Sequence, residues 1–161
     1  MHRFFRWFAL FNALPVFLVA QEPALPAKEI FAKRPTGDLA LEIYQSDDSD
    51  SLRAAVICLH GGGWKKGEPQ HIAAFARELA GEGFVTIAPA YRLSDVAPFP
   101  AQIDDINAAI RWVRENANRY QIDPEKIGII GSSAGGHLAL LSATRPAPEI
   151  ERPNAAIGLG A

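Results

Sequence analysis

The sequence predicts an α/β fold in which helices cover both faces of a mostly parallel sheet. Short, continuously apolar segments alternate along the chain with segments whose apolar residues recur at helical spacing. Strands that are apolar throughout are covered on both faces, and alternating strands and helices favour parallel neighbours. The 161 residues, 48% apolar and 21% charged, are enough for one domain with its own core.

The individual elements follow from local patterns. The expected strands are residues 39–44, 54–59, 84–89, 126–131 and 155–160, and the expected helices are 70–80, 101–118 and 134–143. Residues 39–44 alternate apolar and polar side chains, which predicts a half-exposed edge strand. Residues 54–59, AAVICL, predict a strand covered on both faces. The last expected strand runs to the end of the chain, and an open parallel edge predicts a C-terminally incomplete domain.

The amino-terminal segment has the pattern of a secretory signal peptide. Two arginines precede an apolar stretch that ends at Ala20 and is shorter than the roughly 20 residues that a membrane helix needs. We therefore expect a signal peptide over 1–20 and a secreted or periplasmic protein without stable membrane insertion after cleavage. A retained anchor or amphipathic helix is the alternative. Residues 21–37, with three prolines, predict a leader or linker, so that the domain begins at residue 38.

Charge and cysteine content exclude several function classes. The net charge is −2 and the basic residues are scattered, which argues against a nucleic-acid partner. The single cysteine, Cys58, allows no disulfide within the chain, and its apolar surroundings predict a buried side chain. The acidic stretch 46–51, SDDSDS, predicts a solvated turn rather than a metal site, which is the weaker alternative.

One serine stands where a hydrolase needs its nucleophile. Residues 131–135, GSSAG, match the pattern G-x-S-x-G between an apolar strand and an apolar helix. In that pattern the serine occupies a strained turn that exposes its hydroxyl, and Gly131 and Gly135 avoid clashes that side chains would cause. Ser133 is therefore the candidate nucleophile, whereas Ser132 lacks the glycine spacing.

A glycine-rich segment follows the buried strand 54–59. In HGGGW, residues 60–64, successive glycines let backbone N–H groups approach a ligand closely. The N–H groups of Gly62, Gly63 and Ala134 are candidate donors for the oxyanion of an ester under attack, with His60 and Gly61 supporting the loop. A flexible turn or a phosphate loop is the alternative, although the G-K-[ST] ending of a nucleotide P-loop is missing. The aromatic residue Trp64 fits a pocket wall or the core.

Together, HGGGW, APAYRL and the stretch FPAQIDD to GSSAGGHLA resemble the α/β-hydrolase family over residues 38–161. Within it they most resemble secreted carboxylesterases grouped with feruloyl and acetyl-xylan esterases, and hormone-sensitive-lipase-like esterases. The resemblance implies that Ser133 is the nucleophile, that the glycines hold the oxyanion, and that an acid and then a His follow downstream. It also implies a small-molecule or polysaccharide-linked ester as substrate, and no cofactor.

The sequence departs from the family after Ser133. The following residues include no Asp and a single His, His137, which one helical turn aims at the packing surface. We expect the triad acid and His beyond Ala161, and near inactivity for this chain alone. We expect His2 and His71 to be remote from both motifs, and Glu149 and Glu151 to be weak candidates for the acid. Asp104 and Asp105 are expected to be structural, either capping the helix or pairing with Arg92.

Other functions stay open at this point. The nearest in chemistry is a serine peptidase of the prolyl-oligopeptidase type, which would need a gating domain. A non-catalytic α/β-hydrolase scaffold used for binding comes from a different class, and a nucleotide-binding α/β domain is the weakest alternative. The sequence does not predict the oligomeric state.

Overall fold

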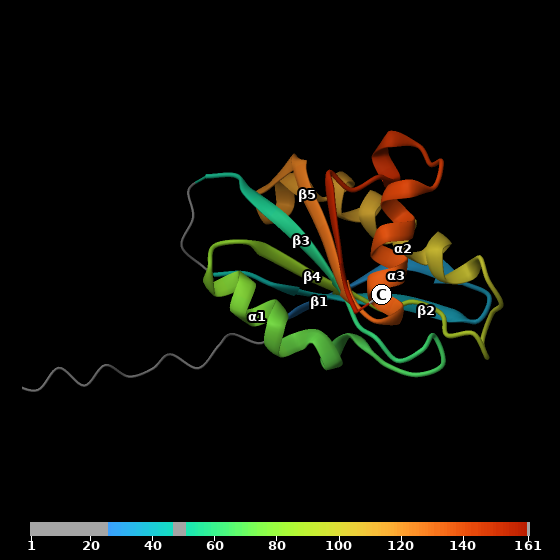
Figure 1. Ribbon diagram of the computed structural model, residues 1–161. Coiled ribbons are helices and arrows are strands. Elements are labelled where there is room, and N and C mark those ends of the chain that lie inside the picture. The colour runs from blue at the N-terminus through green and yellow to red at the C-terminus, as the bar shows by residue number, and fades with distance from the viewer. Residues whose placement is uncertain (1–25, 47–50, 161) are drawn as a thin grey trace, which may run out of the picture.

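The computed structural model describes residues 26–46 and 51–160, which form one twisted sheet with helices on both faces (Figure 1). The strand order is β1-β2-β4-β3-β5-β6. The strands are β1 (Ala27–Arg34), β2 (Gly37–Tyr44), β3 (Arg53–Leu59), β4 (Val85–Pro89), β5 (Ile122–Ser132) and β6 (Ala155–Leu159). The α-helices are α1 (Ala73–Gly81), α2 (Ala101–Glu115) and α3 (Ala134–Thr144); the 3₁₀ helices are η1 (Pro69–Ile72), η2 (Ala117–Tyr120) and η3 (Glu149–Glu151). The predicted signal peptide, residues 1–20, lies outside the described residues.

The strand directions confirm the predicted α/β class with a mostly parallel sheet. Strands β4, β3, β5 and β6 are parallel neighbours, while β1 and β2 pair antiparallel with each other and β2 pairs antiparallel with β4. A helix lies in each connection between successive parallel strands, because parallel strands need a long crossover connection. Within the described ranges, no helix is long and apolar enough to cross a lipid bilayer.

Each face of the sheet has its own apolar core. In β3, Ala55, Ile57 and Leu59 point to the face covered by α2 and α3, whereas Cys58 points to the face covered by α1. Burial of an isoleucine or leucine side chain contributes about 1.5–3 kcal/mol, so both faces stabilise the sheet. The prediction of a buried Cys58 is confirmed, and burial raises the pKa of its thiol to about 12.

The prediction of a leader or linker over 21–37 is wrong for residues 27–34, which form β1 at the edge of the sheet. An edge strand needs few buried side chains, and here Phe31 packs partly against the core while Ile30 is 51% exposed. Pro26 and Pro35 flank the strand, where a missing N–H breaks no ladder bond. The prolines therefore mark the ends of a strand.

The prediction that residues 39–44 form an edge strand is also wrong, because β2 lies between β1 and β4. Its alternating polar residue, Glu42, is buried rather than solvated. Glu42 accepts hydrogen bonds from the Tyr44 hydroxyl (2.5 Å) and the Gln70 amide, and pairs with the Lys28 ammonium at 3.2 Å. Burial opposes the charge of Glu42, but the hydrogen bonds from these three partners outweigh it and lower the pKa of the carboxyl. A buried charge with partners thus mimics the pattern of a half-exposed strand.

Candidate active site

The two sequence motifs meet where strand order reverses. Neighbouring strands β3 and β5 end side by side, with Leu59 opposite Gly131. The chain leaves β3 toward β4 on one side and leaves β5 toward β6 on the other. Such a switch point leaves a crevice at the carboxyl ends of the strands, the usual ligand site of open α/β sheets. Residues 60–64 and Ser133 both lie at this crevice.

Ser133 occupies a strained turn between β5 and α3. Its backbone has φ 51° and ψ −118°, a conformation that costs a non-glycine residue about 1–3 kcal/mol. The turn is held by two backbone bonds: the Ser133 N–H donates to the Leu159 carbonyl (2.8 Å), and the His137 N–H donates to the Ser133 carbonyl (2.9 Å). Ser133 is an exposed residue. The fold therefore stores strain in order to present this hydroxyl.

The glycines around Ser133 are places of close backbone approach. A Cβ on Gly135 would lie 2.5 Å from the carbonyl oxygens of Leu59 and His60, so α3 begins directly against the end of β3. A Cβ on Gly131 would overlap the backbone of Gly135. Both positions of the G-x-S-x-G pattern therefore require glycine for steric reasons.

The glycine loop lies against the serine. A Cβ on Gly61 would lie 3.5 Å from the Cβ of Ser133. Gly62, Gly63 and Trp64 then follow with φ of 122°, 62° and 60°, which is the left-handed region. At Gly62 a side chain would also overlap the Lys66 carbonyl. This run of positive φ explains why successive glycines stand here.

The three candidate donors have unused hydrogen-bonding capacity. Across residues 26–46 and 51–160, the N–H groups of Gly62, Gly63 and Ala134 donate to no protein acceptor. Ala134 is the first residue of α3, whose amino-terminal end favours negative charge. Free N–H groups beside an exposed hydroxyl suit an anion that forms at that hydroxyl.

His60 supports the loop from the interior. It is 2% exposed, its Nδ1 donates to the Gly61 carbonyl (2.8 Å), and its ring stacks on Tyr91 with 4.3 Å between ring centroids. The Tyr91 hydroxyl donates to the His60 carbonyl at 2.9 Å. Burial lowers the pKa of His60, which keeps the imidazole neutral. These contacts order the loop, and the imidazole ring of His60 has its partners inside the protein.

A buried ion cluster fixes the segment after β4. Asp105 accepts hydrogen bonds from the Arg92 backbone N–H (3.0 Å) and side chain (2.8 Å), and from Arg34 Nε (2.9 Å). The predicted pairing of Asp105 with Arg92 is confirmed. Two residues further on, the Ser94 N–H donates to the Trp64 carbonyl at 2.8 Å. The tetrapeptide YRLS therefore holds both ends of the glycine loop, a role that the sequence pattern did not reveal.

The remaining candidate acids and imidazoles that the structure describes are not bonded to Ser133. Glu151 is paired with Arg111, and Glu149 lies in the same 3₁₀ helix, η3. The expectation that His137 points at the packing surface is wrong, because His137 is exposed at the cavity and its ring meets Trp64 edge-on at 5.4 Å between centroids. In the described part of the chain no imidazole or carboxylate is hydrogen-bonded to the Ser133 hydroxyl, and no group of three or more His, Cys, Asp or Glu could hold a metal ion.

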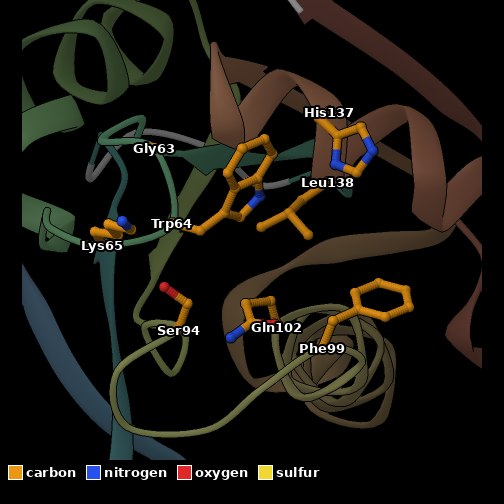
Figure 2. A pocket seen from close by; sticks show the side chains of 8 residues that line it. All are labelled: Gly63, Trp64, Lys65, Ser94, Phe99, Gln102, His137 and Leu138. Carbon is orange, nitrogen blue, oxygen red and sulfur yellow. The ribbon is translucent and has the colours of Figure 1, made fainter.

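A cavity of about 260 Å³ opens beside the loop and the first turns of α3 (Figure 2). Its walls are mainly apolar, with Trp64, His137 and Leu138 on one side and Ser94, Gln102 and Phe99 on the other. The lining residues are Gly63, Trp64, Lys65, Ser94, Phe99, Gln102, His137 and Leu138. Trp64, for which the sequence left pocket and core open, lines this cavity. The contributions of Ser94, Phe99 and Gln102 carried no sequence signal, because only the tertiary fold brings them to the loop.

Comparisons of this chain with known proteins agree on one family. Residues 41–155 match the family model described as BD-FAE. Carboxylesterase NlhH of Mycobacterium tuberculosis is 36% identical over 107 residues, which are 66% of this chain and 34% of that protein. Ethyl acetate hydrolase of Pseudomonas putida is 33% identical over 135 residues, 82% of this chain and 42% of that protein. The chain thus spans less than half the length of these relatives.

Solved structures agree with the sequence relatives. The native form of the thermophilic esterase Est2 from Thermogutta terrifontis superposes with a TM-score of 0.75 at 34% identity, over 83% of this chain and 52% of that one. The butyrate-bound form of the same esterase gives a TM-score of 0.76 at 33% identity, over 83% and 53% of the two chains. At this identity and TM-score, the sheet and its helices correspond to the first half of an esterase fold.

Proposed function

The chain belongs to the BD-FAE family of esterases with the α/β-hydrolase fold, and from this premise we propose that it provides the nucleophile and the oxyanion site of a serine carboxylic ester hydrolase. The observation that carries the proposal is Ser133 itself, which is exposed on a strained turn against a loop of free N–H groups. Names of relatives such as ethyl acetate hydrolase, and the butyrate bound by Est2, support a short acyl ester as substrate.

The proposed reaction is acyl transfer through Ser133. The Ser133 oxygen bonds to the ester carbonyl carbon while a base takes the hydroxyl proton, and the carbonyl oxygen becomes an oxyanion. The N–H groups of Gly62, Gly63 and Ala134 donate to that oxygen, and one such donor typically stabilises the transition state by about 3 kcal/mol. The alcohol leaves with a proton, and water then hydrolyses the acyl-serine.

The base and the acid that orients it are proposed to come from outside the described residues. His60 is buried under the loop and His137 packs against Trp64, so neither is bonded to the Ser133 hydroxyl. A serine without its imidazole remains protonated and loses most of the triad's rate gain, up to about 10⁶-fold. We therefore expect this chain to hydrolyse esters far more slowly than a complete triad would, at the residual rate that the oxyanion donors alone provide.

The proposal is tested by covalent labelling with a fluorophosphonate probe, followed by peptide mapping. We expect the adduct on Ser133, slow formation in buffer, and faster formation when free imidazole supplies a base. Ser133→Ala should abolish the adduct, while Ser132→Ala, the matched change at the neighbouring serine, should keep it. Labelling that moves to Ser132, or no labelling with imidazole, would contradict the proposal; the second result favours a non-catalytic scaffold.

A further inference from the structure

Glu42 is a buried carboxylate at the edge of the sheet where the glycine loop begins. In the antiparallel pair of β2 and β4 it lies opposite Ala88, one residue before the end of β4 at Pro89. The carboxyl ends of the parallel strands β3 and β4 meet at this edge, and β3 leads from it into the glycine loop. A buried charge is costly unless it is paired and hydrogen-bonded. The partners of Glu42 therefore indicate what the carboxylate holds in place.

Two partners of Glu42 belong to the sheet, and a third lies outside it. The Tyr44 hydroxyl donates to Oε2 at 2.5 Å, and the Lys28 ammonium pairs with Oε1 at 3.2 Å. The side-chain amide of Gln70 also donates to Oε1, and Gln70 lies in η1. Burial raises the pKa of Glu42, but these three hydrogen bonds outweigh it and lower the pKa, so the carboxyl is ionised at neutral pH. Because an ionised acceptor makes a hydrogen bond roughly twice as strong as a neutral one, the carboxylate links η1 firmly to β2.

The segment η1 follows the glycine loop directly and lies on the surface, with no buried residue of its own. Ile72, at its end, packs partly against the core on the α1 face. Gln70 anchors the half of η1 that is nearest the loop, through its bond to Glu42. Pro69 precedes Gln70, and its ring holds φ at about −65°. A shift of η1 is therefore passed on to the loop rather than absorbed at this junction.

The returning half of the glycine loop has little room for such a shift. A Cβ on Gly67 would lie 2.6 Å from the Gly61 carbonyl oxygen, so the two backbone segments are in close contact. The N–H groups of Lys65 and Lys66 both donate to the Gly62 carbonyl at 3.2 Å. Movement of η1 therefore displaces the returning segment against Gly61 and Gly62.

We propose that Glu42 is a positioning residue of the oxyanion site, which acts through Gln70 on the glycine loop. The inference rests on the proposed function in one respect, the assignment of the Gly62 and Gly63 N–H groups as donors to the oxyanion. The third donor, Ala134, begins α3, which packs directly against the end of β3. Loss of the link between β2 and η1 should therefore displace Gly62 and Gly63 and leave Ala134 in place.

Gln70→Met tests the proposal, because it removes the donor from an exposed residue and keeps the length of the side chain. The first readout is the backbone amide NMR spectrum of the purified chain. In Gln70→Met the Gly62 and Gly63 resonances should shift and their heteronuclear ¹H–¹⁵N Overhauser effects should fall, while Ala134 keeps its parent values. Gln70→Lys, which again offers a donor to Glu42, should restore both glycines.

The second readout is the rate of fluorophosphonate labelling of Ser133 in the presence of free imidazole. In Gln70→Met it should fall about 10-fold, less than the 10²- to 10³-fold loss that follows removal of a whole oxyanion donor. Gln70→Lys should recover most of the rate. Gln45→Met, the same change at an exposed glutamine whose amide oxygen accepts from Arg53, should alter neither readout. Loop resonances that move without any change in the labelling rate would contradict the proposal.

Unchanged Gly62 and Gly63 resonances in Gln70→Met, or equal changes at Ala134, would also overturn the inference, since a merely structural bond would not move the two glycines alone. If Gln70→Met does not fold, Gln70→Glu sets a second carboxylate against Glu42 and should displace the same resonances. The spectrum needs no adduct on Ser133. Absence of labelling in the parent chain therefore overturns the proposed function, whereas unchanged loop resonances with normal labelling overturn the positioning role alone.

Discussion

Adding one methyl group at Gly135 tests whether the helix α3 and the glycine loop are in direct backbone contact. In Gly135→Ala the new Cβ would lie 2.5 Å from the carbonyl oxygens of Leu59 and His60 and 2.9 Å from the Leu59 carbonyl carbon. All three atoms belong to the backbone, and no flexible side chain can move aside. The start of α3 must therefore shift away from the end of β3.

The cost follows from two opposing effects. Overpacking by a methyl group destabilises a protein by about 1–3 kcal/mol, and a clash with backbone on two sides belongs at the upper end. Alanine is the better helix former by about 1 kcal/mol, which offsets part of this. The expected net loss in the free energy of unfolding is about 2 kcal/mol. The shift also separates Ala134 from the glycine loop, so labelling of Ser133 should slow as well.

Urea denaturation followed by circular dichroism measures the loss, with Gly81→Ala as the control. Gly81 lies at the end of α1 with no atom within 4 Å of an added Cβ. Helix propensity alone should make Gly81→Ala as stable as the parent chain or up to about 1 kcal/mol more stable. If Gly135→Ala matched Gly81→Ala in stability, the close contact between helix and loop would be refuted.

Three further changes test the supports around the site. Asp105→Asn leaves Arg34 and Arg92 without their buried carboxylate and should cost about 3 kcal/mol in urea unfolding, whereas exposed Asp104→Asn should cost about 0.5 kcal/mol or less; equal effects would contradict this account. Because burial lowers the pKa of His60 below its ordinary 6.5, the unfolded chain binds that proton more readily. Its contribution to stability is therefore complete above pH 6.5 and is lost as the pH falls through 6.5 toward the folded pKa. His60→Gln should flatten this slope in unfolding measured at stepwise pH, and an unchanged slope would assign it to other groups. Burial raises the pKa of Cys58 to about 12, so iodoacetamide should leave the folded chain unmodified at neutral pH and react after denaturation; rapid modification of the folded chain would show an accessible thiolate.

The predictable part of the fold depends on continuous burial. Strands β3 and β4 are apolar at nearly every position, so their expected ranges, 54–59 and 84–89, agree with the structure within one residue. The expected helix 101–118 is also found, although α2 ends at Glu115 and η2 continues the segment. Strand β1 escaped prediction because an edge strand buries little and prolines flank it.

Polar residues in the interior explain the remaining differences. Glu42 made β2 look half-exposed, and only the partners supplied by Lys28 and Gln70 account for its burial. In the same way the roles of Tyr91 and Gln102 could not be predicted from the sequence, because they depend on contacts with the glycine loop and the cavity. The local motifs around Ser133 could be read because strain and glycine requirements are encoded within a few residues.

The most direct measurement is a crystal structure of the chain with a phosphonate adduct on Ser133. The phosphonyl oxygen stands where the oxyanion of an ester would form. We expect this oxygen at about 2.7–3.1 Å from the backbone nitrogens of Gly62, Gly63 and Ala134. An adduct oxygen that points into solvent, with those three N–H groups unbonded, would contradict the assignment of the glycine loop as the oxyanion site.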